Sequence, residues 1–287
     1  MYFAPSELVL NSKNQVYHLG LSPENISDKI ILVGDQDRVA LISKFFGTIE
    51  HRSQHREFVC HTGTYKGKRI SVISTGIGTD NIDITLNELD ALVNIDLLKR
   101  EVNAQKKSLT IIRIGTCGIL QPEIPIHSYI ISSHAFGLDN IAHFYAIDFS
   151  KEELTLGNAI SNHLHLPEKI QPYLIGASEA LTAKLESDKT FTGITVTSSG
   201  FYGPQGRQLR LGNTVPGMNE KLTSFVFNDQ KITNFEMESS AIFALGKSLG
   251  HSCATICLGV ANRPNMSFSK GFDQDMDELI EYVLERI

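Results

Sequence analysis

Two arginines follow or precede glycines near the expected ends of strands, and this pattern is typical of an anion site. Arg38 comes four residues after Gly34, and Arg113 stands just before Gly115 and Thr116. Bare backbone N–H groups in such a turn, together with a guanidinium, can face one phosphate or carboxylate. A lone arginine after a strand is more often part of a surface salt bridge. Two such turns in one sheet, however, favour an anionic ligand.

The remaining motifs argue against several other chemistries. Gly76-x-Gly78 is not completed by a third glycine, since Asn81 stands there, and the sequence has no Walker-type phosphate loop and no GxSxG elbow. The close histidine pairs lack a matching HExxH or CxxC, so we interpret them as surface residues. Dinucleotide binding is therefore weakly supported, and nucleotide hydrolysis by a Walker loop, serine hydrolysis and zinc chemistry are disfavoured.

Six apolar runs of strand length must position these residues. They lie near residues 30, 71, 110, 129, 194 and 255, and their β-branched content favours buried strands. Helical spacing predicts helices over Asn81–Val102, Met237–Gly250 and Met276–Ile287, and a hairpin turn is expected near Lys66 and Gly67. The alternation predicts an α/β fold in a single domain spanning residues 1–287, with ligands bound where the strands end.

Composition narrows the setting. The chain has 287 residues, 26 Lys and Arg, 32 Asp and Glu, and a net charge of −6, which argues against a nucleic-acid partner. No apolar run reaches the roughly 20 residues of a membrane span, and the N-terminus does not have the pattern of a secretory signal. The four cysteines are expected to be reduced thiols, so we expect a cytoplasmic protein without a membrane partner.

Seven short stretches, taken in order, resemble the nucleoside phosphorylase family, and within it the branch that cleaves uridine. Each stretch alone is weak, but their shared order over almost the whole chain is a strong signal. They are His18–Leu21, Gly34–Val39, His55–Phe58, Ser74–Gly78, Arg113–Thr116, Phe201–Arg207 and Glu236–Ser239. The resemblance implies a mixed, partly barrel-like central sheet flanked by helices. It also implies a pentosyltransferase that converts a nucleoside and inorganic phosphate reversibly to ribose 1-phosphate and a free base.

The same resemblance implies how phosphate and ribose would be held. The phosphate end would combine guanidiniums, a backbone amide and a hydroxyl, from Gly34, Arg38, Arg56, Arg113 and Thr116. Arg56 would come from the neighbouring subunit, and several guanidiniums are a suitable clamp for phosphate. Glu238 would bond the ribose hydroxyls, Met237 would pack on the sugar, and His18 of the neighbour would reach the 5′-hydroxyl.

At the base end, the resemblance implies that Gln205 and Arg207 read the uracil edge beside Phe201. Bond cleavage builds positive charge on the sugar and negative charge on the base. An amide and a guanidinium stabilise the base without proton transfer, so Gln205, Arg207 and Glu238 are the expected catalytic residues. No cofactor, metal or covalent nucleophile is required. Purine-cleaving relatives place an aspartate where this chain has Val260–Asn262, so a pyrimidine is expected.

Several alternatives stay open at this stage. Relatives that bind an interface cation do so through the equivalents of Glu57, Ile77 and a serine; the third position here is Asn81, which leaves a structural cation as an alternative. The resemblance implies a homo-oligomer, at least a dimer, and a helix-like segment at Ile95–Ser108 would block larger assemblies. The rival functions are a nucleosidase, which has no need of three arginines, a purine-type phosphorylase, and a non-catalytic ligand-binding protein.

Overall fold

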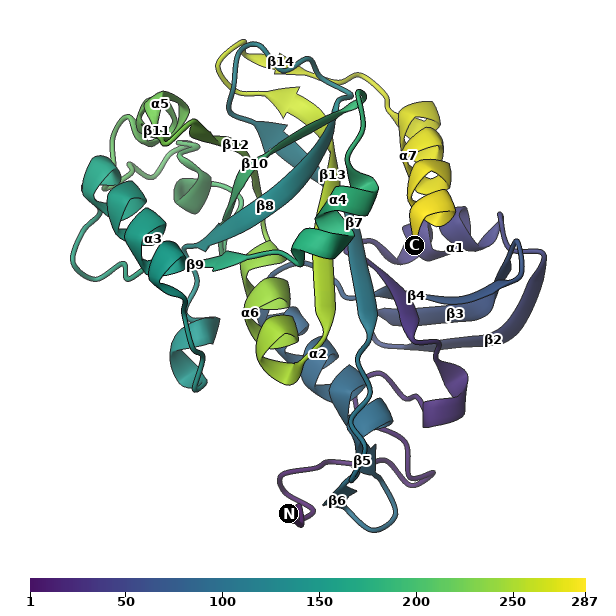
Figure 1. Ribbon diagram of the computed structural model, residues 1–287. Coiled ribbons are helices and arrows are strands. Elements are labelled where there is room, and N and C mark those ends of the chain that lie inside the picture. Colours follow the sequence, from purple (N-terminus) through teal and green to yellow (C-terminus); the bar gives the residue numbers. More distant parts are fainter.

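One twelve-stranded sheet with parallel and antiparallel pairs forms the centre of the computed structural model, which describes residues 1–287 (Figure 1). Ten strands follow one another in the spatial order β11 (Val226–Phe227), β12 (Gln230–Glu236), β10 (Thr190–Thr197), β8 (Tyr129–Gly137), β13 (Ser252–Asn262), β7 (Thr110–Ile119), β1 (Lys29–Val33), β4 (Lys68–Ser74), β3 (Phe58–Tyr65) and β2 (Thr48–His55). Two more strands pair beside this path, β9 (Tyr173–Gly176) with β8 and β14 (Ser267–Phe268) with β13. Strands from nearly the whole chain thus join one sheet.

Part of the sheet closes on itself. β12 pairs not only with β10 but also with β7, through Asn234 opposite Ile119 and Phe235 opposite Gly118. The strands β12, β10, β8, β13 and β7 therefore form a ring, and β1, β4, β3 and β2 extend from it. Register shifts in β10 and β13 interrupt the regular pairing inside the ring, as β-bulges do where strands bend. The predicted mixed, partly barrel-like sheet is confirmed.

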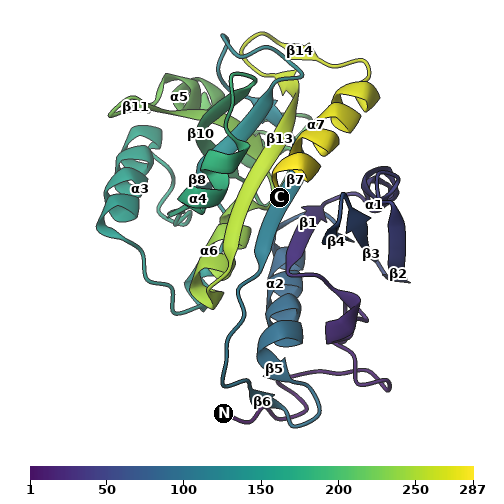
Figure 2. The ribbon, with the colours of Figure 1, turned by 45° about the vertical axis from the view of Figure 1, so that its right-hand side comes forward.

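Seven α-helices cover the sheet (Figures 1 and 2). They are α1 (Gln36–Ser43), α2 (Thr79–Asn94), α3 (Lys151–Leu164), α4 (Glu179–Leu185), α5 (Met218–Ser224), α6 (Ser239–Leu249) and α7 (Asp273–Arg286). Strand β1 shows how the two faces are filled, because its side chains alternate. Ile30 and Leu32 belong to the core under α2 and α6, whereas Ile31 and Val33 belong to the core under α1 and α7.

The predicted helix over Asn81–Val102 is wrong in its second part, and so is the helix-like prediction for Ile95–Ser108. Helix α2 ends at Asn94, and a small hairpin of β5 (Ile95–Asp96) and β6 (Glu101–Val102) follows. The Asn94 side chain accepts from the backbone N–H of Lys107 (2.7 Å) and donates to its carbonyl (3.1 Å). Hydrogen bonds from a side chain to the backbone compete with the backbone hydrogen bonds that would continue the helix. The apolar spacing beyond Asn94 could not reveal them.

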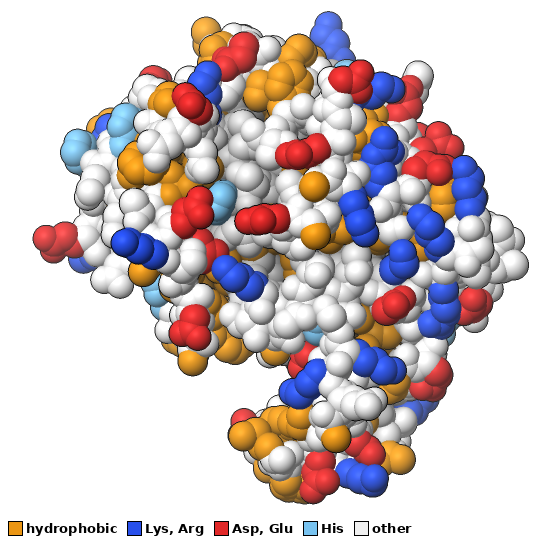
Figure 3. Space-filling view, in the orientation of Figure 1, with side chains coloured by type: hydrophobic (Ala, Val, Ile, Leu, Met, Phe, Trp, Pro, Cys, Tyr) orange, Lys and Arg blue, Asp and Glu red, His pale blue; other side chains and the backbone are white.

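The hairpin packs against the N-terminal segment and forms a protrusion, at the bottom of Figure 1. The backbone N–H of Phe3 donates to the Arg100 carbonyl (2.8 Å), and the Arg100 guanidinium donates to the Leu8 carbonyl (2.6 Å). Hydrophobic side chains gather on this protrusion (Figure 3), where Tyr2 and Leu98 are exposed.

None of the helices is both long and apolar enough to span a bilayer.

Candidate active site

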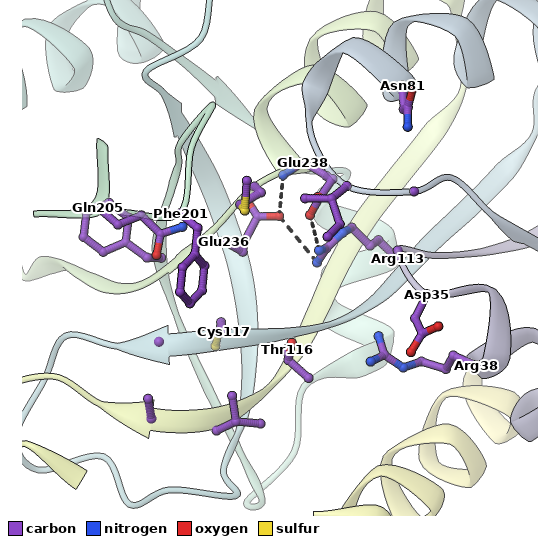
Figure 4. A pocket seen from close by; sticks show the side chains of 18 of the residues that line it. Asp35, Arg38, Asn81, Arg113, Thr116, Cys117, Phe201, Gln205, Glu236 and Glu238 are labelled. Atoms are coloured by element: carbon purple, nitrogen blue, oxygen red, sulfur yellow. Dashed lines mark hydrogen bonds and ion pairs between the residues drawn. The ribbon is translucent and has the colours of Figure 1, made fainter. Parts of the chain in front are cut away.

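A cavity of about 770 Å³ lies where β1, β4 and β12 end and where β7 and β13 pass beneath (Figure 4). Nine predicted site residues line it together: Gly34, Arg38, Arg113, Thr116, Phe201, Gln205, Arg207, Met237 and Glu238. They come from four separate parts of the chain, and the cavity is of a size that holds a small organic ligand. His18 and Arg56 do not line this cavity in the same chain.

Arg113 lies within a strand, not in a turn at its end. Strand β7 continues to Ile119 because Gly115, Thr116 and Cys117 pair with β13. The buried Arg113 side chain folds back over Gly115, where a Cβ atom would lie 2.0 Å from its Nη1. Gly115 is thus required for space rather than for a turn, which corrects the interpretation of this motif from sequence.

Two buried carboxylates hold the Arg113 guanidinium (Figure 4). Nη2 donates to Oε2 of Glu238, Nη1 lies 3.4 Å from Oε2 of Glu236, and Nη1 also donates to Sγ of Cys257 at 3.2 Å. Burial by itself would lower the pKa of Arg113, but the charges of Glu238 and Glu236 raise it above its usual value. The guanidinium is therefore charged and fixed in direction before any ligand arrives.

The two carboxylates also organise the turn that follows β12. Glu236 accepts from the backbone N–H groups of Glu238 (2.9 Å) and Ser239 (3.0 Å) and from the Thr197 hydroxyl (2.5 Å). Glu238 accepts from the backbone N–H of Gly78 (2.7 Å), which joins this turn to the start of α2. Burial raises the pKa of Glu238 above its usual range, although Arg113 opposes the shift. The sequence predicted no role for Glu236, because its charged partner Arg113 is distant in the chain.

Arg38 faces the same space from the first turn of α1 (Figure 4). Asp35 caps this helix by accepting from the backbone N–H of Asp37 (3.0 Å), so the helix begins directly beside Gly34. Burial and the nearby charge of Arg113 lower the pKa of Arg38. Two guanidiniums that repel each other across a cavity, with the Thr116 hydroxyl nearby, form a site for an anion.

The opposite end of the cavity carries a second polar group of side chains. The Arg207 guanidinium stacks on the Phe201 ring, 3.7 Å from its centroid, and donates to the Phe201 carbonyl (2.6 Å) and to Oε1 of Gln205 (2.5 Å). Burial and the charge of Arg263 lower the pKa of Arg207 to about 10, so it stays charged at neutral pH. Arg263, which sequence reasoning left without a role, donates to the Gln205 carbonyl at 3.3 Å. This end can donate to a polar ring edge and also offers an aromatic face.

His18 and Arg56 lie together on a patch beside the cavity, where the side chain of Gln36, a lining residue, donates to the Arg56 carbonyl (2.9 Å). The Tyr17 ring packs edge-on against the His18 ring, with centroids 5.0 Å apart, and the Arg56 guanidinium lies 5.8 Å from the Tyr17 centroid. The His55 ring donates to the His18 carbonyl at 2.8 Å. Arg56 is exposed and His18 is half-buried, so a neighbouring chain can reach this patch; the contribution of both residues to a neighbour's cavity stays a prediction.

Glu57, Ile77 and Asn81 lie at the rim of the cavity. Gly76 brings them together, because it has a positive φ of 74° and a Cβ atom there would lie 2.5 Å from Nδ2 of Asn81 and 3.3 Å from Cγ of Glu57. Residues 1–287 contain no group of three or more His, Cys, Asp or Glu side chains arranged to hold a metal ion. The structural cation stays an alternative.

Comparison with known proteins shows which family has this fold and sequence. The family model of the phosphorylase superfamily matches residues 28–286. The chain belongs to this superfamily. It is 30% identical to a uridine phosphorylase of Thermococcus kodakarensis over 95% of this chain and 87% of that protein. It is 28% identical to a DeoD-type purine nucleoside phosphorylase of Oceanobacillus iheyensis over 83% of this chain and 84% of that protein.

A solved structure gives the same picture in three dimensions. The Trypanosoma brucei nucleoside phosphorylase, described as showing uridine phosphorylase activity, superposes with a TM-score of 0.89 and 31% sequence identity. The match covers 98% of this chain and 99% of that one. The nucleoside phosphorylase resemblance and the fold class predicted from sequence are both confirmed.

Proposed function

We propose that this protein is a pentosyltransferase that catalyses the reversible phosphorolysis of uridine, giving ribose 1-phosphate and uracil. One observation carries the proposal. A single cavity has an arginine-lined anion end and an amide–guanidinium end, with Glu238 and Met237 between them. Phosphate, ribose and a polar base need these three environments in this order. The uridine phosphorylases among the similar proteins support the same reaction.

The geometry supplies a mechanism for this reaction. Phosphate binds between Arg38 and Thr116, on the side of the ribose where Arg113 is held. Glu238 accepts hydrogen bonds from the ribose hydroxyls, and its negative charge also favours the positive charge that builds on the sugar. The departing uracil gains negative charge, which the charged Arg207 and the Gln205 amide stabilise.

The end of β13 favours a pyrimidine over a purine. Val260 and Ala261 line the cavity, and neither can protonate a purine. Asn262 is turned away, since its Nδ2 donates to the carbonyls of Gln121 (2.9 Å) and Ile124 (2.8 Å). A buried site built to satisfy the uracil edge leaves its donors unpaired with the wrong base, which costs several orders of magnitude in rate.

A panel of nucleosides tests the proposal. Purified protein is incubated with uridine, inosine or adenosine, with and without phosphate, and the released base is identified by chromatography. We expect uridine to release uracil, and to do so only when phosphate is present. Uracil release without phosphate would make the protein a nucleosidase, and hypoxanthine release at a similar rate would make it a purine-type phosphorylase. No release from any nucleoside would leave a ligand-binding protein.

We further propose that the enzyme acts in the cytoplasm as a homodimer with shared sites. Four buried, free cysteines suit a reducing compartment. The outward-facing patch with His18 and Arg56 suits a two-fold interface that offers both residues to the partner's cavity.

Mixing two inactive variants tests the shared site. Arg38→Ala and Arg56→Ala dimers should each be nearly inactive, because every site lacks one guanidinium. In a mixed dimer one site carries both changes and the other carries neither. Random pairing makes about half of the dimers mixed, so activity should recover to roughly a quarter of wild type. If mass spectrometry confirms subunit exchange and activity stays at the parental level, Arg56 acts within its own chain.

A further inference from the structure

The carboxylate of Glu88, in the third turn of α2, holds the segment around His18 with four hydrogen bonds. Its oxygens accept from the backbone N–H of His18 (2.9 and 3.1 Å), from the backbone N–H of Leu19 (2.7 Å) and from the ring Nδ1 of His18 (2.7 Å). The side chains are 31% exposed for His18 and 15% exposed for Glu88. One rigid helix thus fixes both the backbone and the ring of a residue in an irregular segment.

These contacts decide which ring nitrogen is available to a ligand. A carboxylate can only accept, so Nδ1 of His18 carries a hydrogen. Nε2 then has a free lone pair in the neutral ring, and no group in residues 1–287 bonds to it. The Tyr17 ring against one side and the His55 bond to the His18 carbonyl leave the ring little freedom to turn over. His18 therefore offers an oriented acceptor on the outer surface.

We propose that Glu88 is a positioning residue that fixes His18 in the tautomer accepting a hydrogen bond from the ribose 5′-hydroxyl, and thereby makes the enzyme select nucleosides with a free 5′-hydroxyl. The inference rests on the proposed function, in which His18 reaches the sugar in the partner's cavity. Without Glu88, the ring can rotate or place its hydrogen on Nε2, and the acceptor is lost for part of the molecules.

The test compares uridine with 5′-deoxyuridine, which lacks only the hydroxyl in question. The ratio of kcat/KM for the two substrates is measured at saturating phosphate for wild type, His18→Ala, Glu88→Ala and Glu88→Gln. Asp83→Asn is the matched control, since Asp83 lies on the same helix and bonds the Tyr145 hydroxyl instead of His18. We expect wild type and Asp83→Asn to prefer uridine by about tenfold or more, the effect of one lost hydrogen bond in a desolvated site.

His18→Ala and Glu88→Ala should both lower this ratio to near one, because each removes a hydrogen bond that only uridine can form. Glu88→Gln keeps the shape but turns an NH₂ group toward a backbone N–H, so its ratio should fall at least threefold. If Glu88 had a merely structural role, its loss would lower kcat/KM equally for both substrates and leave their ratio unchanged. An unchanged ratio in either folded Glu88 variant therefore overturns the proposal. An unchanged ratio in His18→Ala also overturns it. A wild type that cleaves neither substrate refutes the proposed function instead.

Discussion

Replacing Arg113 by alanine tests the site, because the structure predicts that its two carboxylate partners, Glu236 and Glu238, respond differently to the loss of the guanidinium. Glu236 keeps three neutral donors when Arg113 is removed, namely two backbone N–H groups and the Thr197 hydroxyl. Glu238 keeps only the backbone N–H of Gly78 and loses its one cationic partner. The loss in free energy of unfolding should therefore come mainly from the buried Glu238 carboxylate, which no longer has a cationic partner.

Removing one partner of a buried ion pair costs about 3–5 kcal/mol. A chain of this length loses about 2 °C in Tm per kcal/mol, so Arg113→Ala should melt about 6–10 °C below wild type near neutral pH. Burial already raises the pKa of Glu238, and loss of Arg113 raises it further. Above about pH 4.3 the Glu238 side chain of the unfolded state releases its proton, whereas that of the folded state still holds it. The free energy of unfolding therefore falls as the pH rises from about 4.3 towards the raised pKa of Glu238 in the folded state.

The assay is thermal unfolding followed by circular dichroism between pH 5 and pH 8 at one protein concentration. The Tm deficit of Arg113→Ala should grow with pH, and the double variant Arg113→Ala/Glu238→Gln should recover part of it and lose the added pH dependence. Phosphorolysis by Arg113→Ala should fall roughly 30-fold or more, from a lost contact of about 2–5 kcal/mol. A deficit that does not vary with pH, or a double variant no more stable than the single one, would refute this account of Glu238.

Two further predictions concern the ends of the cavity. Gly115→Ala places a Cβ atom where the Arg113 guanidinium now lies, so KM for phosphate should rise about tenfold or more; an unchanged KM in a folded variant would separate Arg113 from phosphate. Arg207→Lys cannot keep both the stacking on Phe201 and the bond to Gln205, so kcat/KM for uridine should fall about 10- to 100-fold. Wild-type kcat/KM in that variant would show that a point charge alone suffices at the base.

The strands and their chemical edge were predictable from local pattern. The β-branched runs that became β1, β4, β7, β8, β10 and β13 were all identified, because a buried strand needs apolar side chains on both faces. Gly34 and Arg38, placed just after the run that became β1, had to lie at the edge where the parallel strands end, whereas the role of Glu238 came from the family resemblance. Phe201, Gln205 and Arg207 came from the family resemblance rather than from pattern.

The sequence could not show features that depend on long-range pairing. Strand β7 continues past Arg113 only because β13 and β12 pair with its second half, which turns a presumed loop into a buried strand. Helix α2 ends at Asn94 through bonds to Lys107, although the apolar spacing runs on. Glu236, Arg263 and Glu88 are ordinary charged residues in the sequence, and their partners lie in distant segments.

The charge balance of the cavity supports the proposal that a neighbour's arginine contributes to phosphate binding. Two carboxylates already offset Arg113, and Asp35 stands beside Arg38, so the phosphate end of one chain holds two guanidiniums against three carboxylates. The N-terminus of α1 and the Thr116 hydroxyl add donors but little net charge. A multiply charged anion therefore gains little from an isolated chain. In the proposed dimer, Arg56 of the partner subunit would add a guanidinium that no carboxylate offsets, so we expect phosphate affinity to depend on subunit association.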